Sequence, residues 1–211
     1  MKLIILGPAG AGKGTQSEFI VDAYSIAHIS TGDIFRKNLK EGTPLGLKAK
    51  EYMDGGLLVP DALTVEMLIS RISESDCQNG YLLDGFPRSL AQADALEAAG
   101  EAIDQVLLID VDYSLLTERI VGRRVCPECG AAFHISNNPP KIEGICDKCG
   151  AELVHRPDDK EETIKARLVE YDEKTKPLIG YYEEKSLLAK VGGDKPIAQV
   201  SQAIKQILDS L

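Results

Sequence analysis

Nine residues near the N-terminus have the types and spacing needed to hold a phosphate group. The segment Gly7–Thr15 has the sequence GPAGAGKGT and follows a short apolar run, Lys2–Leu6. A helical pattern follows at Gln16–Tyr24, so strand, glycine-rich turn and helix come in the order that a phosphate-binding loop requires. Glycines let the backbone close around an oxyanion, and the helix N-terminus adds a positive dipole end. Lys13 would add a mobile charge for β- and γ-phosphates.

The loop departs in one place from the general pattern. Gly14 follows the lysine where Ser or Thr is usual, and the hydroxyl comes one residue later, at Thr15. Which hydroxyl lies nearest a bound metal ion therefore stays open.

An acid ends a second apolar run. Tyr81–Leu83 precedes Asp84, and the turn Gly85–Arg88 follows. A carboxylate at a strand end beside a phosphate loop typically orients a magnesium ion or its waters. A helix cap or turn residue is the alternative, and the position at a strand end favours the metal role.

Several arginines are candidates for phosphate contacts, because a guanidinium fork matches phosphate oxygens in pairs. For any single one, a surface salt bridge is the alternative, and of the neighbours Arg123 and Arg124 we favour Arg123. The candidates are Arg36, Arg88, Arg123, Arg156 and Arg167.

Four of the five cysteines form two C-x-x-C knuckles, Cys126–Cys129 and Cys146–Cys149, with 16 residues between them. This spacing is typical of a zinc ribbon with four thiolates around one ion. Two disulfides or a redox pair are the alternatives. We expect His134 and His155 to be ordinary residues of this region, and Cys77 to be a surface or half-buried thiol without chemistry.

Composition limits the function classes. The chain has 211 residues, 44% hydrophobic content, no run of 18 apolar residues and no signal-peptide pattern, so we expect a cytoplasmic protein. Its net charge of -9 argues against a nucleic-acid-binding protein.

Short apolar runs alternate with helical patterns, which predicts an α/β fold: a parallel sheet flanked by helices. The expected strands are Lys2–Leu6, Ala27–Ile29, Gly80–Leu83, Gln105–Val111 and Leu188–Val191, with Pro196–Ala198 as a possible addition at that edge. The expected helices are 14–24, 32–41, 45–54, 61–74 capped by Asp61, 89–99, 114–124, 160–185 interrupted by Pro177, and 199–211.

Two inserts break the βα rhythm, at 30–59 and at 123–159. Inserts at the carboxyl ends of parallel strands are where ligand-closing lids are expected. The second insert has few apolar residues of its own, so a metal ion would supply its missing core.

With these residues identified, the chain resembles the adenylate kinase family, specifically the bacterial type with a long, zinc-bearing lid. The resemblance covers essentially the whole chain. It rests on separate motifs: GPAGAGKGT at 7–15, ISTGD at 29–33, LLDGFPR at 82–88, GRR at 122–124 and RPDD at 156–159. The order Lys13-Gly14-Thr15 is the family's own form.

The resemblance implies a P-loop NTPase-like fold and magnesium-dependent transfer of phosphate between ATP and AMP to give two ADP, which maintains the adenine nucleotide balance. It also implies structural zinc at the four cysteines and a monomer without nucleic-acid or membrane partners. The implied domains are a core (1–29, 60–122 and 160–211), an NMP-binding domain (30–59) and a lid (123–159).

The resemblance also implies the site residues. ATP would contact Gly10, Ala11, Gly12, Lys13, Gly14, Thr15, Arg119, Arg123, Ala132, Phe133 and Lys195. AMP would contact Thr31, Arg36, Leu57, Leu58, Val59, Gly85, Phe86, Pro87, Arg88, Gln92, Arg156 and Arg167. The catalytic set would be Lys13, Asp84, Arg88, Arg123, Arg156 and Arg167.

Three alternatives remain. A UMP/CMP-type kinase shares the phosphate loop and the DGFPR motif, but usually has a short lid without cysteines. A zinc-ribbon nucleic-acid-binding ATPase is disfavoured because residues 123–156 hold five Lys/Arg against four Asp/Glu, with one aromatic, Phe133. A nucleotide sensor would bind without forming ADP.

Overall fold

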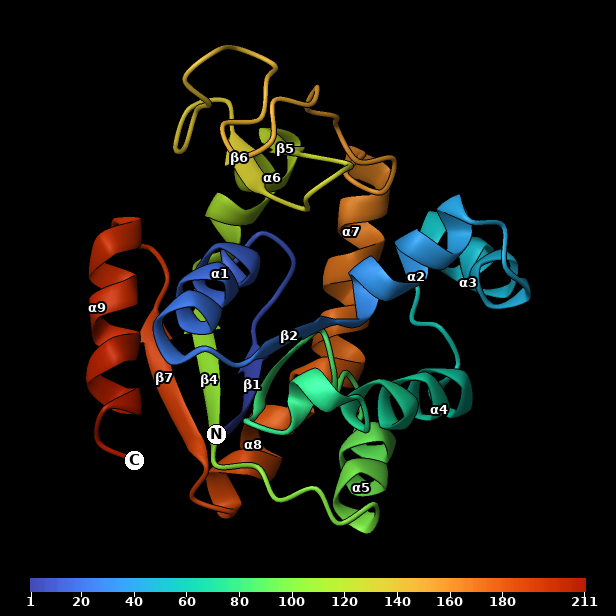
Figure 1. Cartoon of the computed structure of the whole chain (residues 1–211), viewed down its shortest axis with the longest axis vertical. Helices are drawn as coiled ribbons and strands as arrows, with labels where there is room; N and C mark the ends of the chain where they lie inside the picture. The colour runs from blue at the N-terminus through green and yellow to red at the C-terminus, as the bar shows by residue number, and fades with distance from the viewer.

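The computed structural model describes residues 1–211 and has a five-stranded sheet at its centre (Figure 1). The strand order is β2-β3-β1-β4-β7, and every neighbouring pair is parallel. The strands are β1 (Lys2–Leu6), β2 (Ala27–Ser30), β3 (Tyr81–Asp84), β4 (Gln105–Asp110) and β7 (Leu188–Gly192). The predicted α/β fold with a parallel sheet is confirmed.

Nine α-helices connect and cover the strands. They are α1 (Lys13–Tyr24), α2 (Thr31–Lys40), α3 (Pro44–Asp54), α4 (Asp61–Ile72), α5 (Leu90–Ala98), α6 (Leu116–Val121), α7 (Glu161–Glu170), α8 (Pro177–Glu184) and α9 (Ile197–Leu208). None of them combines the length and the apolar character that a membrane crossing requires.

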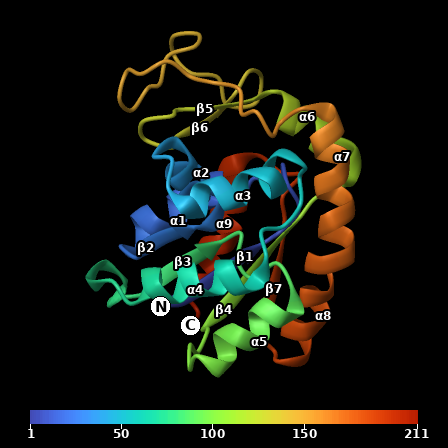
Figure 2. The same cartoon turned by 90° about the vertical axis from the view of Figure 1, so that its right-hand side faces the viewer.

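The central strands are apolar on both faces, as parallel strands covered by helices must be. In β1, Leu3 and Ile5 face one layer and Ile4 and Leu6 face the other, because successive side chains alternate. The first layer contains α1 and α9 (Figure 1). The second contains α4, α5 and α8, grouped around the lower part of the sheet in Figure 2. This double packing fixes the strand ends that carry the site.

Residues 123–159 form a separate structure at the top of Figure 1. It begins with a two-stranded antiparallel hairpin, β5 (Arg123–Val125) and β6 (Ala132–His134), which the sequence did not predict. Its buried apolar cluster contains only Cys126, Ala131 and Cys146. Helices α2 and α3 pack together beside the sheet as the other insert.

Three predicted elements were wrong in detail. The expected helix 114–124 ends at Val121, and Arg123 and Arg124 lie in β5. The added strand at Pro196–Ala198 is absent: Pro196 has no N–H for a sheet, and its carbonyl accepts the N–H groups of Gln199 and Val200 at 2.9 and 3.2 Å. Helix α9 therefore begins at Ile197.

The expected interruption at Pro177 comes earlier. A π-helical turn occupies Tyr171–Thr175, with the N–H of Lys176 donating to the carbonyl of Tyr171 at 2.8 Å. Proline lacks an N–H and its ring clashes with the carbonyl four residues before it, so the preceding turn widens.

Two side chains also differ from expectation. Asp61 does not cap α4; its carboxylate accepts hydrogen bonds from Ser89 Oγ at 2.9 Å and Gln92 Nε2 at 2.7 Å, which ties α4 to α5. Cys77 is buried and packs in the core, where its thiol contacts Arg71 at 3.0 Å.

Candidate active site

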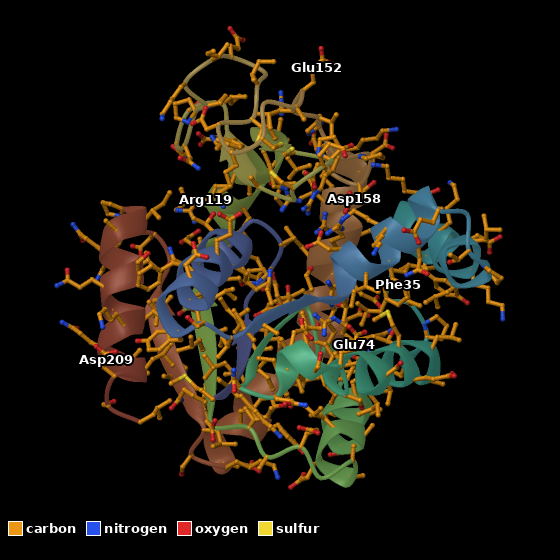
Figure 3. All side chains as sticks on the ribbon, in the orientation of Figure 1. Phe35, Glu74, Arg119, Glu152, Asp158 and Asp209 are labelled. Carbon is orange, nitrogen blue, oxygen red and sulfur yellow. The ribbon has the colours of Figure 1, made fainter.

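A cavity of about 820 Å³ lies between the phosphate loop, the strand ends and the lid. Figure 3 shows Arg119 and Asp158 directly below the lid, whereas Glu152 lies at its outer end. The predicted residues that line this cavity are Gly10, Ala11, Gly12, Lys13, Gly14, Thr15, Arg36, Asp84, Arg88, Arg119, Arg123, Ala132, Phe133, Arg156, Arg167 and Lys195. Residues far apart in the sequence therefore meet at one place.

The phosphate loop has the backbone that its glycines predict. Gly12 precedes α1 with φ of +98°, and nothing lies within 4 Å of the position a Cβ would take. An oxyanion can therefore approach the helix N-terminus there. Lys13 curls back over the loop, donating from Nζ to the carbonyls of Gly7 at 2.8 Å and Pro8 at 2.9 Å.

The positive charge of Lys13 is energetically unfavourable at its buried position. Burial, together with the charges of Arg88 and Arg167, lowers the pKa of its ammonium to about 8 against the opposing effect of Asp84. An anion bound in the loop would relieve this cost.

Asp84 ends β3 at the floor of the cavity, 3.6 Å from Nε2 of His28 on β2. Burial acts to raise the pKa of Asp84, but the His28 contact and the charge of Lys13 outweigh it, and the pKa lies below its usual value. The carboxylate therefore stays ionised. Oxygen ligands of this kind suit Mg²⁺ and its waters, so the residues present fit that ion.

A second, smaller cavity of about 80 Å³ opens beside the first, under α2 and α3. Its lining residues from the predicted set are Thr31, Arg36, Leu57, Leu58, Val59, Gly85, Arg88, Gln92 and Arg167. Phe86 and Pro87 line neither cavity, and Phe86 packs in the core. Arg156 lines only the larger one.

Hydrogen bonds fix the wall that the two cavities share. The N–H of Arg88 donates to Gln92 Oε1 at 2.7 Å, and Arg88 Nε donates to the carbonyl of Gly85 at 2.8 Å. Thr31 Oγ1 donates to the same carbonyl, also at 2.8 Å. The guanidinium of Arg88 is therefore held at the junction of the cavities.

Three carboxylates that the sequence did not single out hold the other arginines. Arg123 forms a two-point pair with the buried Asp159. Arg167 contacts Asp159 at 3.2 Å and Asp158 at 3.1 Å. Arg36 pairs with Asp33. Asp158 and Asp159 directly follow Arg156-Pro157, so the RPDD motif carried the signal that could have found two of them.

Arg156 is the least satisfied of these cations. Its Nε is buried without a hydrogen-bond partner, and its closest carboxylate, Asp33, lies 3.8 Å away. Burial, then the charge of Arg36, lowers the pKa of Arg156 to about 10; burial and Arg167 do the same for Arg88. Both remain protonated near neutral pH. A cluster of underpaired buried cations predicts an anionic ligand with several charges.

The four knuckle cysteines converge on one point, their sulfur atoms all lying within 4.8 Å of one another. Cys126 Sγ lies 3.3 Å from Cys149 Sγ, and Cys129 Sγ lies 3.6 Å from Cys146 Sγ. Four thiolates at about 2.3 Å from a tetrahedral ion would lie about 3.8 Å apart. The cysteines are therefore positioned to bind one metal ion.

A parallel sheet, a phosphate loop and two adjoining cavities with shared arginines define a nucleotide-binding phosphotransferase of the P-loop class. The family described as adenylate kinase matches the chain over residues 5–187. The chain belongs to the adenylate kinase family.

Curated relatives agree over the full length. Adenylate kinase of Clostridioides difficile (strain 630) is 55% identical, with 100% of this chain and 99% of the relative covered. That of Clostridium novyi (strain NT) is 54% identical, with 99% of each covered. That of Clostridium perfringens (strain SM101 / Type A) is 53% identical, with 100% and 99% covered.

Proposed function

We propose that the protein catalyses reversible, magnesium-dependent transfer of a phosphoryl group from ATP to AMP, giving two ADP. The observation that carries this proposal is the junction of the two cavities. Gly32, Arg36, Arg88 and Arg167 line both of them. Two mononucleotides bound in these cavities would therefore meet with their phosphates among shared cations.

ATP occupies the larger cavity in this proposal. Its phosphates lie on the backbone N–H groups of Gly10–Thr15, where Lys13 turns from the loop carbonyls to the β- and γ-phosphates. Its base lies between the lid and the last helix. Ala132 and Phe133 contact the base from the lid and Lys195 contacts it from the core, while Arg119 and Arg123 lie at the lid hinge; all five line that cavity.

AMP occupies the smaller cavity, with its phosphate toward Arg36 and Arg88. The remaining predicted contacts are Thr31, Leu57, Leu58, Val59, Gly85 and Gln92, all in its lining. Arg156 and Arg167 then hold the transferring group from the lid side. Phe86 and Pro87 act indirectly, since they shape the strand-end turn that positions Gly85 and Arg88.

Phosphoryl transfer requires little covalent catalysis from the protein. An AMP phosphate oxygen is already an anionic nucleophile, so positioning and dispersed positive charge dominate. Lys13, Arg88, Arg123, Arg156 and Arg167 supply that charge. Mg²⁺ bound with ATP would neutralise charge on the β- and γ-phosphates, and the ionised Asp84 would orient its waters.

We propose three domains: the core (1–29, 60–122 and 160–211), the NMP-binding domain (30–59) and the lid (123–159). Closure of both inserts would exclude water that would otherwise hydrolyse ATP. Lid closure of this kind is a well-known property of adenylate kinases.

We further propose that zinc fills the four-cysteine site as a structural ion. A closed shell of four thiolates leaves no open position for catalysis. The small buried cluster of the lid supports a stabilising role, since it is too small to hold the insert together alone.

We also propose a cytoplasmic monomer without nucleic-acid or membrane partners. Of these, the absence of nucleic-acid binding is supported by the net charge of -9.

A coupled assay for ADP made from ATP and each of AMP, CMP, UMP and GMP tests the proposal. We expect ADP formation with AMP and at least tenfold lower kcat/KM with the other three. ATP binding without ADP formation would overturn it in favour of a sensor, and preference for UMP or CMP would assign the other kinase type.

A further inference from the structure

The two cysteine knuckles of the lid are copies of one structural unit. Each has the pattern C-x-x-C-G-A, at 126–131 and 146–151. In each, the N–H of the first cysteine donates to the carbonyl of the alanine at 2.9 Å. The N–H of the glycine donates back to the carbonyl of the first cysteine, at 3.0 Å in one knuckle and 2.9 Å in the other.

The residue before the second cysteine differs in charge between the two copies. It is Glu128 in the first knuckle and Lys148 in the second. Glu128 Oε1 lies 3.2 Å from Lys40 Nζ at the end of α2, in the NMP-binding insert. Lys148 Nζ lies 2.8 Å from Glu18 Oε2 on α1, in the core. The same position thus reaches two different parts of the molecule with opposite charge.

These contacts, which we call the latch pairs Glu128–Lys40 and Lys148–Glu18, join segments that no apolar cluster connects. The lid cluster contains lid residues only. The pair Lys148–Glu18 also borders the larger cavity, since both residues line it. Lys148–Glu18 thus joins the lid to the core at the wall of the larger cavity, whereas Glu128–Lys40 joins the lid to the NMP-binding insert outside both cavities.

We propose that Glu128 and Lys148 are positioning residues that hold the lid closed over both nucleotide sites, and that the metal-bound knuckles set their direction. This inference rests on the proposed function and extends it. One ion binding all four cysteines fixes both knuckle turns at once. The bound ion would thereby direct the negative charge of Glu128 toward Lys40 at the end of α2, and the positive charge of Lys148 toward Glu18 on α1.

The contribution of each latch pair to lid closure follows from the solvent exposure of its side chains. The side chains are 67% and 62% exposed in Lys40 and Glu128, and 55% and 37% exposed in Lys148 and Glu18. Exposed pairs contribute little, so losing one should change closure about two- to threefold. Reversing a charge replaces attraction by repulsion of similar size, and the expected change is about fivefold. Apparent nucleotide affinity falls with the closed fraction.

The test compares charge reversals with charge swaps. Glu128→Lys and Lys148→Glu should each raise the KM for nucleotide and weaken an inhibitor that joins two adenosines through a polyphosphate, by about fivefold. The kcat should stay within twofold, because no group at the reacting phosphates changes. The doubles Glu128→Lys with Lys40→Glu, and Lys148→Glu with Glu18→Lys, should return both values toward wild type.

Matched controls lie on the same lid. Lys141 and Glu143 are exposed, and neither side chain forms an ion pair. Lys141→Glu and Glu143→Lys make the same charge changes and should leave KM and inhibitor affinity within twofold. The single variants Lys40→Glu and Glu18→Lys repeat the test from outside the metal site, so a folding defect in a knuckle variant would not block it.

Metal depletion links the latch pairs to the cysteines. In metal-free protein the reversals should weaken the inhibitor no further than depletion does alone, as measured by calorimetry. The proposal would be overturned if the charge reversals left KM and inhibitor affinity unchanged, or if the charge swaps failed to restore them. It would also be overturned if the reversals weakened the inhibitor as much in metal-free protein as in metal-bound protein. Wild-type protein that makes no ADP would instead overturn the proposed function, so the two failures are distinguishable.

Discussion

The phosphate loop and the lid face each other across the larger cavity, but different forces hold them in place. The loop at Gly7–Thr15 is anchored by β1 and α1, whose residues Leu3, Ile4 and Ile20 are fully buried. The lid has only four buried apolar residues, three of which form its cluster, and it depends on four converging cysteines. One wall of the site is thus held by packing, and the other by ligands and ion pairs.

This difference separates the part of the site that stays fixed, the core, from the part that moves, the lid. Core packing holds Lys13 at the start of α1, Asp84 at the end of β3 and Arg88 in the turn after it, on a sheet whose side chains interdigitate with two helical layers. The lid's attachments are few and polar, and such contacts break and re-form easily. A site that must admit two nucleotides and then exclude water benefits from one fixed wall and one detachable wall.

The largest expected effect comes from the fixed wall. Arg88→Ala removes a buried guanidinium at the junction of the cavities, and we expect kcat/KM to fall by about a hundredfold to a thousandfold. Arg156 lies in the lid, but it too is a buried guanidinium facing the larger cavity, and Arg156→Ala should cost about a hundredfold. Steady-state kinetics measure both. Arg124→Ala is the matched control: its side chain bonds only to backbone carbonyls of Val121 and Arg123, so turnover should stay within about threefold. Near-normal turnover in either test variant would contradict its assigned role.

Removing the metal tests the detachable wall. A strong chelator should lower the melting temperature by about 5 °C, which corresponds to about 2 kcal/mol at Tm. Turnover at saturating nucleotides should decline less than KM rises, because the groups around Lys13 stay in place. Cys126→Ser serves as control, since its melting should no longer respond to the chelator. An unchanged melting temperature in wild-type protein would remove the structural role of the metal.

The fixed wall is also the part that the sequence predicted best. The loop, Asp84 and Arg88 belong to local patterns in which strand, turn and helix follow directly in the chain. The four cysteines were found for the same reason, because their spacing is the signal. The two layers around the sheet followed from apolar runs that alternate with helical patterns.

What the sequence left out depends on contacts between distant segments. The pairing of Arg123 with Asp159 spans 36 positions, and the pairing of Lys148 with Glu18 spans 130. No local periodicity encodes such pairs. The hairpin of β5 and β6 was missed because its strands are three residues long and Arg123-Arg124 follow a helical pattern without a break. Gly122, just before these arginines, was the residue in the sequence that could have indicated the end of the helix.

A pH series separates the two walls electrostatically. The pKa of Lys13 is about 8 in the ligand-free protein, whereas a bound polyphosphate would favour the charged ammonium. Below pH 8 the lysine is already protonated and ATP binds without proton uptake. Above pH 8 the free protein has lost this proton, so binding must take one up and affinity falls. We expect about a tenfold loss between pH 7 and 9.

Calorimetry in buffers of different ionisation enthalpy measures that proton uptake directly. Lys13→Arg is the control, because arginine does not titrate in this range, and its ATP affinity should be flat from pH 7 to 9. Equal proton uptake by wild type and Lys13→Arg would show that another group titrates and would contradict the assignment.

The smallest expected effect lies at the joint between the two walls. Gly122 follows α6 with φ of −76°, which any residue adopts, but a Cβ there would lie 2.3 Å from Nε2 of His134 in β6. The His134 ring is held in turn, since its Nδ1 accepts the N–H groups of Ser136 and Asn137, each at 3.0 Å. Gly122→Ala should therefore push the hairpin away from α6, at about 1 kcal/mol, and raise the KM for ATP about fivefold.

Gly180 provides the control for that substitution. It lies within α8, and nothing is within 4 Å of its Cβ position, so Gly180→Ala should leave KM unchanged and stabilise the protein slightly. The double variant Gly122→Ala with His134→Ala removes the clash, and it should recover part of the lost ATP affinity if the contact between α6 and β6 sets the lid's position. If the double variant instead bound ATP more weakly than Gly122→Ala and His134→Ala do singly, His134 would support the hairpin through its hydrogen bonds alone. The joint would then tolerate displacement of α6.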